Sequence, residues 1–443
     1  MKKSTRLLSA ALVTTFIAGI LALPAAAAGS NYTAVAAQET SFTKYLLVDK
    51  GQKAPKIDFT YTVASGTAIA PTTSTLQVYP GVGTPDVKTV SFTTTDTPEA
   101  TSLNANYDTY MKTIEVDFKT SAITFSEPGV YRYIITENNN SGSGVYYDVD
   151  PSDPTDSSLY GTRIRTLDVY VEDDLSTDAK DLIVTSYVLY NGTVTTAPPS
   201  ASTASNGTAL TATTPVITPA SPTNGQEPSG ATKTDRIVNY FTTYKITFGK
   251  EVTGNQGSRD KYFKLTLTLT SPVDATLLVD ISKADAAAGT NDATTVSGSN
   301  PTTINLTANT ASATDFYLQD GQYITVAGLP VDTVYALTED AEGYTSTEGI
   351  VQALSTLNWD ADASTGTATD GFDALSDAVN GTITNADIHT GYTNDKQGII
   401  PTGVLVKIAP VIGVGLIIVA GVIFFAVVTT RNREQDDLDT ENS

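Results

Sequence analysis

The sequence predicts an all-β protein with two β-sandwich domains in tandem, between an N-terminal signal peptide and a C-terminal transmembrane helix. First, residues 264–270 (KLTLTLT), 114–118 (IEVDF) and 167–171 (LDVYV) alternate apolar and polar side chains with the period of a β-strand. Second, no long amphipathic helical pattern appears between such segments. Third, three short segments recur in the same order. Antiparallel sandwiches whose sheets each have one solvent-facing side fit this pattern.

The N-terminus, residues 1–28, has the pattern of a secretory signal peptide. Three basic residues precede an apolar run from Leu7 to Leu23, and the small-residue stretch PAAAAGS follows. A charged region, an apolar region and a small-residue cleavage site are the three parts of such a signal. We expect cleavage near Ala28 and export of the remaining chain.

The body of the chain, about residues 29 to 403, is predicted to lie outside the cell. At ~150 residues per domain it would hold two or three domains. The recurring segments divide it into a first domain, residues 29–244, and a second domain, residues 245–398. Residues 194–232 are rich in Thr, Ala, Pro, Ser and Gly, so we expect a solvated loop or linker inserted in the first domain.

Charge and composition exclude several classes of function. The chain carries 48 acidic and 26 basic side chains, a formal net charge of -22, which disfavours nucleic acid as a partner. It has no cysteine, so disulfides and thiolate metal sites are excluded. Its single histidine, His389, excludes His-based catalytic triads and histidine-rich zinc sites, and we expect an ordinary strand or loop residue there. No metal or other cofactor is predicted.

The recurring segments place one lysine, one glutamate and one asparagine in each predicted domain. The three pairs are Phe42-Thr43-Lys44 with Phe248-Gly249-Lys250, YIITE (133–137) with YALTE (335–339), and Val238-Asn239-Tyr240 with Thr393-Asn394-Asp395. The third pair is the weakest match. Two related domains follow, each beginning near its lysine and ending near its asparagine.

These polar residues are predicted to lie on apolar faces of their strands. Since side chains alternate along a strand, Glu137 shares a face with Tyr133 and Ile135, and Lys44 shares one with Phe42. The second lysine and glutamate have apolar neighbours in the same way, as does the first asparagine. Because Lys and Glu are almost never buried without a partner, we expect them to interact with each other.

Such a buried group has a specific chemistry available to it. Burial favours the neutral forms of lysine and glutamate. A neutral lysine amine is a nucleophile, and a protonated glutamic acid can donate to an asparagine amide oxygen. Attack of the amine on the asparagine side-chain carbon, with loss of ammonia, would leave a Lys–Asn isopeptide bond. The reaction would occur once, on the protein itself, so the protein is not predicted to be an enzyme.

This arrangement resembles the streptococcal shaft pilins with isopeptide-linkage domains, the subunits of sortase-assembled Gram-positive pili. In that family the lysine lies on the first strand, the glutamate in a Y-x-x-T-E segment and the asparagine near F-T-N of the last strand. The resemblance covers most of residues 35 to 403 and implies Ig-like sandwiches of the CNA type. It implies cross-links Lys44–Asn239 and Lys250–Asn394, with Glu137 and Glu339 as catalytic proton shuttles. Here IVNYF and GYTND replace F-T-N, and the first asparagine follows a long insertion.

Simpler interpretations exist for each residue. Lys44 and Lys250 could be lysines that guard a strand edge or extend to solvent, and the glutamates and asparagines could be surface residues. Recurrence of all three in order favours the cross-links. The acidic stretch DVDPSDPTD (148–156) has the charge of a calcium loop but lacks the glycine and terminal Glu of an EF-hand, so we expect a solvated loop.

The C-terminus, residues 399–443, contains a predicted membrane span. Residues 411–428 (VIGVGLIIVAGVIFFAVV) carry no charge and are long enough, with their flanks, to cross a bilayer once. Arg431 and Arg433 follow at once, which places the tail in the cytoplasm.

The segment before this span is similar to a sortase sorting signal. Such signals usually read L-P-x-T-G, whereas Ile400-Pro401-Thr402-Gly403 lacks the residue between Pro and Thr. It is closer to the E/Q-V-P-T-G signal of the shaft pilins, with isoleucine in place of Glu or Gln. The resemblance implies a cut between Thr402 and Gly403 and transfer of Thr402 to an amine. A chance PTG before a permanent anchor is the alternative.

Polymerisation requires a lysine acceptor on the neighbouring subunit. The chain has no Y-P-K motif, and its nearest string, VYPGV (78–82), lacks the lysine. In the resembled family the acceptor lies a few residues before the first asparagine, and Lys233 matches that position. A solvated charge is the simpler interpretation of the same residue.

The leading hypothesis is a structural protein, the major shaft subunit of a covalently linked pilus. Its partners would be a sortase, neighbouring pilin subunits, peptidoglycan or a basal pilin, and host surface ligands. It would be secreted and wall-anchored, with a transient membrane segment. The alternative is a wall-anchored adhesin, or a minor tip or basal pilin, that uses similar domains as a stalk. An enzyme acting on an external substrate ranks third, because no pattern suggests a substrate cleft.

Overall fold

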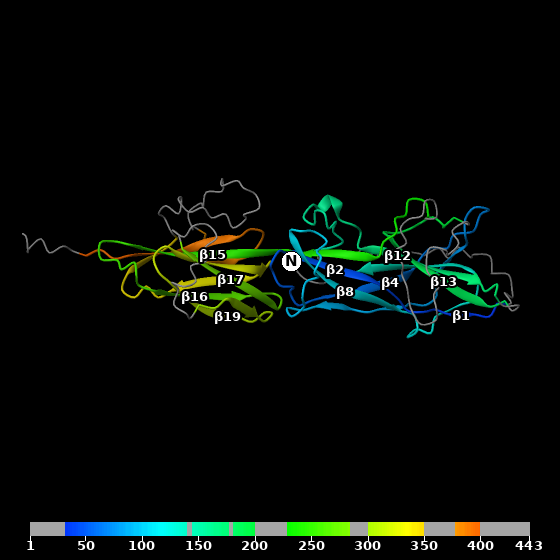
Figure 1. Ribbon diagram of the computed structural model, residues 1–443, viewed down its shortest axis with the longest axis horizontal. Helices are drawn as coiled ribbons and strands as arrows, with labels where there is room; N and C mark the ends of the chain where they lie inside the picture. Colours follow the sequence, from blue (N-terminus) through cyan, green and yellow to red (C-terminus); the bar gives the residue numbers. More distant parts are fainter. Residues whose placement is uncertain are drawn as a thin grey trace, which may run out of the picture.

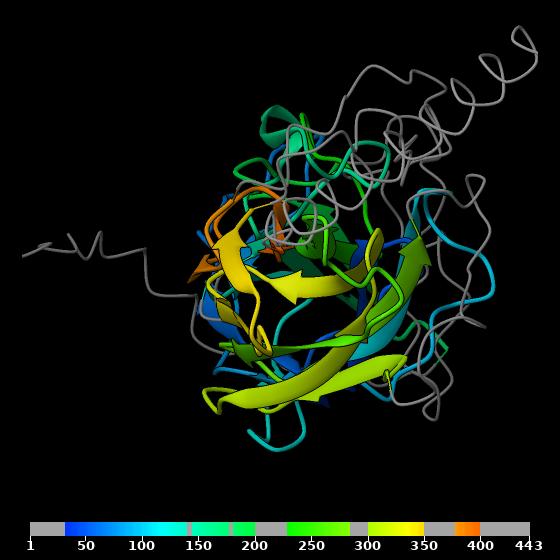
Figure 2. The ribbon, with the colours of Figure 1, turned by 90° about the vertical axis from the view of Figure 1, so that its left-hand side faces the viewer.

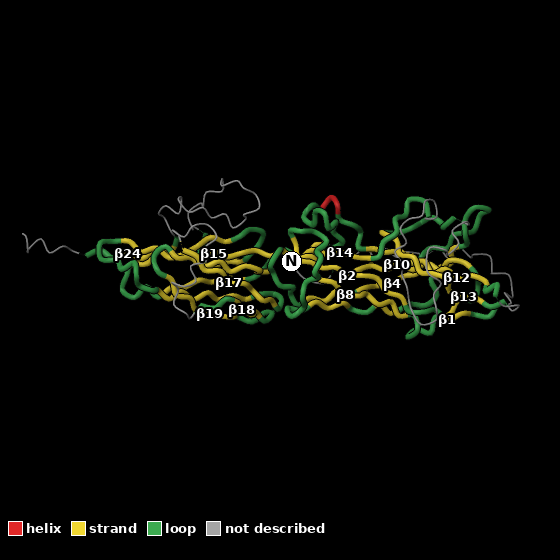
Figure 3. Tube along the Cα trace, in the orientation of Figure 1, coloured by secondary structure: helices red, strands yellow, loops and turns green. Residues whose placement is uncertain are grey.

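The computed structural model describes residues 32–139, 144–176, 180–199, 228–283, 300–349 and 377–398. In these residues the chain forms an elongated rod of two groups of strands placed end to end (Figure 1). Figure 2 looks along the rod, with the second group nearest the viewer. Strands dominate the described chain, and one short 3-10 helix, Ser157–Leu159, interrupts them (Figure 3). The all-β prediction is confirmed.

The first group is a sandwich of two five-stranded sheets. One sheet has the order β11-β14-β2-β8-β6, and the other has the order β13-β12-β10-β4 with β5 beside β10. Two small ribbons, β1-β9 and β3-β7, complete it. The strands are β1 Val35–Ala36, β2 Thr40–Asp49, β3 Ile57–Phe59, β4 Tyr61–Ser65, β5 Val78–Pro80, β6 Asp86–Val87, β7 Val90–Phe92, β8 Tyr107–Asp117, β9 Thr124–Phe125, β10 Gly129–Glu137, β11 Val145–Tyr146, β12 Ile164–Asp173, β13 Leu182–Asn191 and β14 Arg236–Phe241.

The second group is a sandwich of a six-stranded and a four-stranded sheet. Their orders are β18-β17-β20-β15-β24-β22 and β19-β16-β21-β23. The strands are β15 Thr243–Thr253, β16 Phe263–Thr270, β17 Ala275–Lys283, β18 Thr303–Leu306, β19 Ser312–Leu318, β20 Gln322–Pro330, β21 Val334–Glu339, β22 Thr345–Glu348, β23 Asn380–Thr382 and β24 Ile388–Asp395. A single residue, Thr242, separates β14 from β15, so the last strand of one sandwich leads directly into the first strand of the next.

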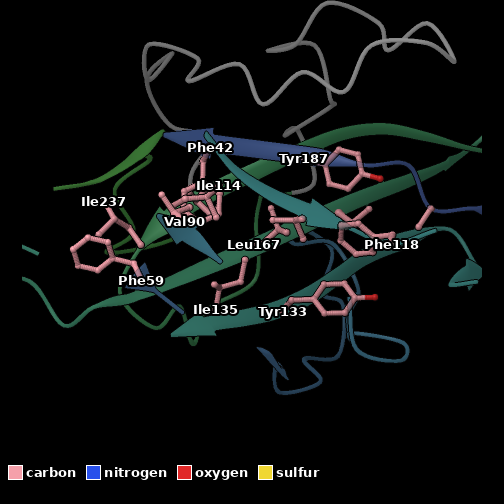
Figure 4. Close-up of a cluster of buried hydrophobic side chains, with 14 of the residues drawn as sticks. Phe42, Phe59, Val90, Ile114, Phe118, Tyr133, Ile135, Leu167, Tyr187 and Ile237 are labelled. Carbon is pink, nitrogen blue, oxygen red and sulfur yellow. The ribbon is translucent and has the colours of Figure 1, made fainter. Parts of the chain in front are cut away.

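Each sandwich encloses its own apolar core. The first core joins Phe42 and Ile114 of one sheet to Tyr133, Ile135 and Leu167 of the other, as Figure 4 shows. In the second sandwich, β16 follows the expected alternation, because its three leucines are buried and its threonines are half-buried. Burying one face of each sheet is what holds two layers together.

The prediction of one solvent-facing side per sheet is wrong for β10. Arg132, which points away from the main core, is only 1% exposed. A smaller apolar cluster that includes Val78, Val130 and Tyr170 covers this outer face. Arg132 forms a two-pronged ion pair with Asp168, with both distances 2.7 Å, and its guanidinium also donates to the carbonyl of Val194. The outer face is therefore closed by the chain before β5, with Ile69 and Leu76, and by the chain after β13.

The contacts of Arg132 involve the first residues of the predicted insertion, residues 194–232. Residues 194–199 pack on the sandwich, where Arg132 donates to the carbonyls of Val194 and Thr196. This part is not the solvated loop that composition predicted, because its backbone carbonyls satisfy a buried guanidinium. Residues 200–227 lie outside the described residues.

Within the described part of the chain, no helix is both long enough and apolar enough to cross a membrane. The predicted signal peptide, the predicted span at 411–428 and the Ile400-Pro401-Thr402-Gly403 segment all lie outside that part.

Candidate functional site

The first candidate site lies in the core of the first sandwich, between its two sheets. Lys44 is on β2, Asn239 is on β14, and Glu137 ends β10 of the facing sheet. Lys44 Nζ lies 2.5 Å from Glu137 Oε1, and Asn239 Nδ2 donates to Glu137 Oε2 at 3.1 Å. All three residues are fully buried. Each carboxyl oxygen thus holds one of the two groups that the predicted reaction would join.

The pairing of β2 with β14 explains how the lysine and asparagine meet. The two strands run parallel, and Lys44 lies opposite Ile237. Asn239 is two residues further along, so it shares a face with Ile237 and is a diagonal neighbour of the lysine. Strands from the two ends of the domain thereby bring the amine and the amide onto the same inner face.

The second candidate site repeats this geometry in the second sandwich. Lys250 on β15 lies opposite Tyr392 on the parallel strand β24, so Asn394 is again two residues further along. Glu339 ends β21 of the facing sheet. Lys250 Nζ is 2.9 Å from Glu339 Oε1, and Asn394 Nδ2 donates to the same oxygen at 3.1 Å. The six residues singled out in the sequence therefore come together as two separate triads.

Burial lowers the pKa of both lysines, the direction that the predicted chemistry needs. Desolvation lowers the pKa of Lys44 to about 8 against the opposing charge of Glu137. Desolvation likewise lowers the pKa of Lys250 to about 8, opposed by Glu339. A lysine in this range has an accessible neutral amine near neutral pH, and that amine is nucleophilic.

Aromatic rings help to exclude water from each site. The Lys44 amine lies 4.3 Å from the centre of the Phe59 ring, and the Lys250 amine lies 4.9 Å from the centre of the Phe263 ring. Both rings are fully buried. Phe59 comes from the short ribbon strand β3, whereas Phe263 begins β16. In a water-poor pocket, the interactions between amine, carboxyl and amide are stronger than they would be in solvent.

Asp148 contacts the first site, a contact that no pattern in the sequence predicted. Its backbone N–H donates to Asn239 Oδ1 at 2.9 Å. Its carboxylate, which is buried, forms an ion pair with Arg165, whose Nη2 lies 2.6 Å from Oδ1. The solvated-loop prediction for residues 148–156 is therefore wrong at Asp148, because a cation on β12 compensates the buried charge. Beyond it, Ser152, Asp153, Thr155 and Asp156 are exposed, as expected, whereas Val149 and Pro154 are buried.

The amide oxygen of the second site has different surroundings. Asn394 Oδ1 is buried, and no described residue donates a hydrogen bond to it. Glu339 instead accepts an additional hydrogen bond at Oε2 from the hydroxyl of Ser346, at 2.7 Å. Lys250 also donates to the carbonyl of Tyr392, at 3.1 Å. The two sites thus share the lysine, glutamate and asparagine but not the contacts around them.

The other predicted site residues lie elsewhere. Lys233 is half-buried just before β14, where it forms an isolated antiparallel bridge with Tyr190. His389 is part of β24. The described residues contain no group of three or more His, Asp or Glu side chains placed to hold a metal ion. The predicted cleavage position, Thr402 and Gly403, lies outside the described residues and stays a prediction.

Comparison with known proteins finds the resemblance that the motifs predicted. The chain is 26% identical over 438 residues to a protein named Pilin from Streptococcus pyogenes serotype M1, covering 96% of this chain and 98% of that protein. Residues 244–396 match a family described as a domain of unknown function, DUF7601.

Two solved structures show a similar coverage. A major pilin from Streptococcus pyogenes has a TM-score of 0.49 at 21% identity, covering 82% of this chain and 100% of that chain. The major pilin protein T-13 from the same species has a TM-score of 0.44 at 21% identity, covering 82% of this chain and 98% of that chain.

Proposed function

We propose that the protein is a structural subunit of a covalently assembled pilus and that an intramolecular Lys–Asn isopeptide bond locks each of its two sandwiches. The observation that carries this proposal is the same Lys–Glu–Asn geometry built twice, from separate segments of the chain. An ordinary lysine–glutamate ion pair would not require a buried asparagine two residues further along the adjacent parallel strand. The similarity to a streptococcal pilin over nearly the whole chain supports the pilus assignment.

In each domain the lysine amine attacks the side-chain carbon of the asparagine. Glu137 or Glu339 takes the proton that the amine loses and delivers it to the departing nitrogen, which leaves as ammonia. One amide is broken and one is formed, so the reaction needs no cofactor. The cross-link closes a loop of more than about 100 residues and would stabilise each domain by about 5 kcal/mol in the loop-entropy description.

Assembly would use one residue just before β14 of the first sandwich and one residue after the second sandwich. A sortase would cut between Thr402 and Gly403 and transfer Thr402 to Lys233 of a neighbouring subunit. The membrane span at 411–428 would then be temporary, and peptidoglycan or a basal pilin would receive the last subunit. The proposed domains remain residues 29–244 and 245–398.

Intact-mass analysis of the mature extracellular part tests the two internal bonds. We expect a mass lower than the sequence mass by two ammonia molecules, and Glu137→Ala and Glu339→Ala should each restore one. Glu115→Ala, a change at an exposed glutamate on β8, is the matched control and should keep both losses. A wild-type mass equal to the sequence mass would refute the cross-links.

Cell-wall extracts test the assembly step. A regular high-mass ladder of the protein should disappear in Lys233→Ala and persist in Lys53→Ala, a change at an exposed lysine of the same domain. A single anchored band in the wild type would contradict the shaft assignment and favour a wall-anchored adhesin.

A further inference from the structure

The two triads differ at the atom where negative charge would develop. When a lysine amine attacks an asparagine side chain, the electrons of the C=O bond move to Oδ1 in the tetrahedral intermediate. A donor already aimed at that oxygen stabilises the intermediate without reorganisation. In the first site the Asp148 N–H lies 2.9 Å from Asn239 Oδ1, whereas in the second site Asn394 Oδ1 has no donor among the described residues.

We propose that the backbone N–H of Asp148 is an oxyanion donor for formation of the Lys44–Asn239 bond, held in position by Arg165, and that no described residue supplies such a donor for the second bond. This inference rests on the proposed function, because it concerns the rate of one of the two proposed cross-links. The Asp148 N–H touches a reacting atom, and Arg165 acts through it as a positioning residue.

Asp148 is fixed at every polar atom that could orient its N–H. Its carboxylate accepts hydrogen bonds from Arg165 at 2.9 and 2.6 Å and from the backbone N–H of Arg163 at 3.0 Å. Its carbonyl accepts the N–H of Gly161 at 2.6 Å. With a φ of +52°, Asp148 has the left-handed backbone conformation, which aspartate tolerates better than most residues. Such a residue keeps this conformation only where its surroundings hold it there.

The hydrogen bonds that hold Asp148 are also connected to β14, the strand that carries Asn239. Arg165 Nε donates to the carbonyl of Arg236 at 3.0 Å, and Arg236 begins β14. One guanidinium therefore connects Asp148 and the strand of Asn239. Gly161 leaves room for this arrangement, because a Cβ at that position would lie 2.1 Å from Asp148 Oδ2.

The chemical step balances with these groups alone. The lone pair of neutral Lys44 Nζ forms the new bond to Asn239 Cγ, and Oδ1 becomes the oxyanion that the Asp148 N–H stabilises. Glu137 accepts a proton from the Lys44 nitrogen and passes it to Nδ2. The carbonyl then re-forms, the Cγ–Nδ2 bond breaks and ammonia leaves.

A direct test removes the donor and leaves every side chain in place. The full chain is made by cell-free translation with the α-hydroxy analogue of aspartate at position 148, which replaces the amide N–H by an ester oxygen. Samples are quenched at intervals, and the two cross-linked peptides are quantified by mass. We expect the Lys44–Asn239 bond to form ~10²-fold more slowly, the usual effect of losing one oxyanion donor, and the Lys250–Asn394 bond to keep its rate. The same ester at Ser152, in the same loop, is the control and should change neither rate.

Gly161→Ala is the second variant, because it moves Asp148 without removing a charge. We expect roughly tenfold slower formation of the first bond, as a partial loss of the donor effect, with the second bond unchanged. The pH profile should keep its shape, since no titratable group is altered, whereas a changed environment of Lys44 would shift it. A first bond that keeps its wild-type rate in the ester variant would overturn the proposal, as would equal slowing of both bonds. Absence of both bonds in the wild type would instead remove the proposed cross-links themselves.

Discussion

The first triad, on β2, β10 and β14, and the second triad, on β15, β21 and β24, are two solutions to one geometric problem. In both, a strand near the start of the domain pairs in parallel with the domain's last strand, which sets the asparagine diagonally beside the lysine, and the facing sheet supplies the glutamate. The two triads differ in the hydrogen bonds that their glutamates accept. Glu137 divides its two oxygens between lysine and asparagine, whereas Glu339 receives both on Oε1 and a serine hydroxyl on Oε2.

This difference separates two requirements for the proposed reaction. Strand register brings the reacting groups together, and both sandwiches meet that requirement. Polarisation of the amide depends on what the connecting loops supply, and only the first sandwich has a donor at the amide oxygen among the described residues. Proximity and electrostatic stabilisation are separate contributions to a rate, so the two domains allow them to be compared within one molecule.

The largest expected difference between the two sites is in their response to a pulling force. If load enters at Lys233 and leaves at Thr402, the covalent path runs through β14 and β15 and crosses from Lys250 to Asn394, so the first bond lies outside it. Glu339→Ala should release the segment between Lys250 and Asn394, on the order of 500 Å at full extension. Glu137→Ala should release nothing along this path.

Single-molecule force spectroscopy measures this difference. The chain has no cysteine, so Lys233→Cys and Gln397→Cys provide defined handles. With both bonds intact, only the short segment before Lys250 can lengthen. Equal extension of the two glutamate variants would show that the load does not follow the proposed path.

The next contrast concerns stability. Asn239→Ala and Asn394→Ala remove one cross-link each while leaving the buried lysine paired with its glutamate. Each should lower the free energy of unfolding of its own domain by about 5 kcal/mol, as judged by calorimetry. The loop closed in the first domain is longer, but closure entropy grows only logarithmically, so the two losses should differ by less than about 1 kcal/mol. Asn305→Ala, at an exposed position of β18, is the control. A similar loss of stability in this variant would contradict the assignment of the loss to the cross-links.

Dependence on pH should be a property that the two sites share. Burial lowers the pKa of both lysines from 10.5 to about 8, so the neutral amine increases as pH rises toward 8 and is the main form above it. Both bonds should therefore form faster with rising pH and level off above about 8, with a loss of about tenfold for each pH unit below. The two profiles should have the same shape and differ only in height. A flat profile at either site would exclude the neutral amine as the attacking group there.

The smallest expected effect is at Ser346. Removing its hydroxyl in Ser346→Ala takes one hydrogen bond from Glu339 and loosens the orientation of the proton shuttle. A net loss of about 1 kcal/mol corresponds to roughly fivefold slower formation of the second bond. Thr345→Ala, at an exposed neighbouring position on β22, should leave the rate of the second bond unchanged. Ser346→Ala should leave the rate of the first bond unchanged. If Ser346→Ala does not slow the second bond, the serine does not assist that site.

Much of the site could be predicted from local patterns in the sequence. The alternation along YIITE, YALTE and the two lysine segments predicted that Glu137, Glu339, Lys44 and Lys250 face inward, and the structure confirms that their side chains are buried. The recurrence of three segments predicted which residues form each triad. Asp148 escaped this reasoning because its partner, Arg165, lies 17 residues away on β12, and an acidic loop with exposed neighbours has no local mark of a buried charge.

The sequence by itself determined the all-β class, the two-domain repeat and the inward faces of the triad residues, because a period of two residues fixes which side of a strand is buried. The tertiary structure alone decided the parallel register that sets Asn239 beside Lys44, the closed outer face around Arg132 and the aim of the Asp148 N–H. These features join segments up to about two hundred residues apart. No local pattern specifies such a contact, because its geometry depends on how whole sheets pack against one another.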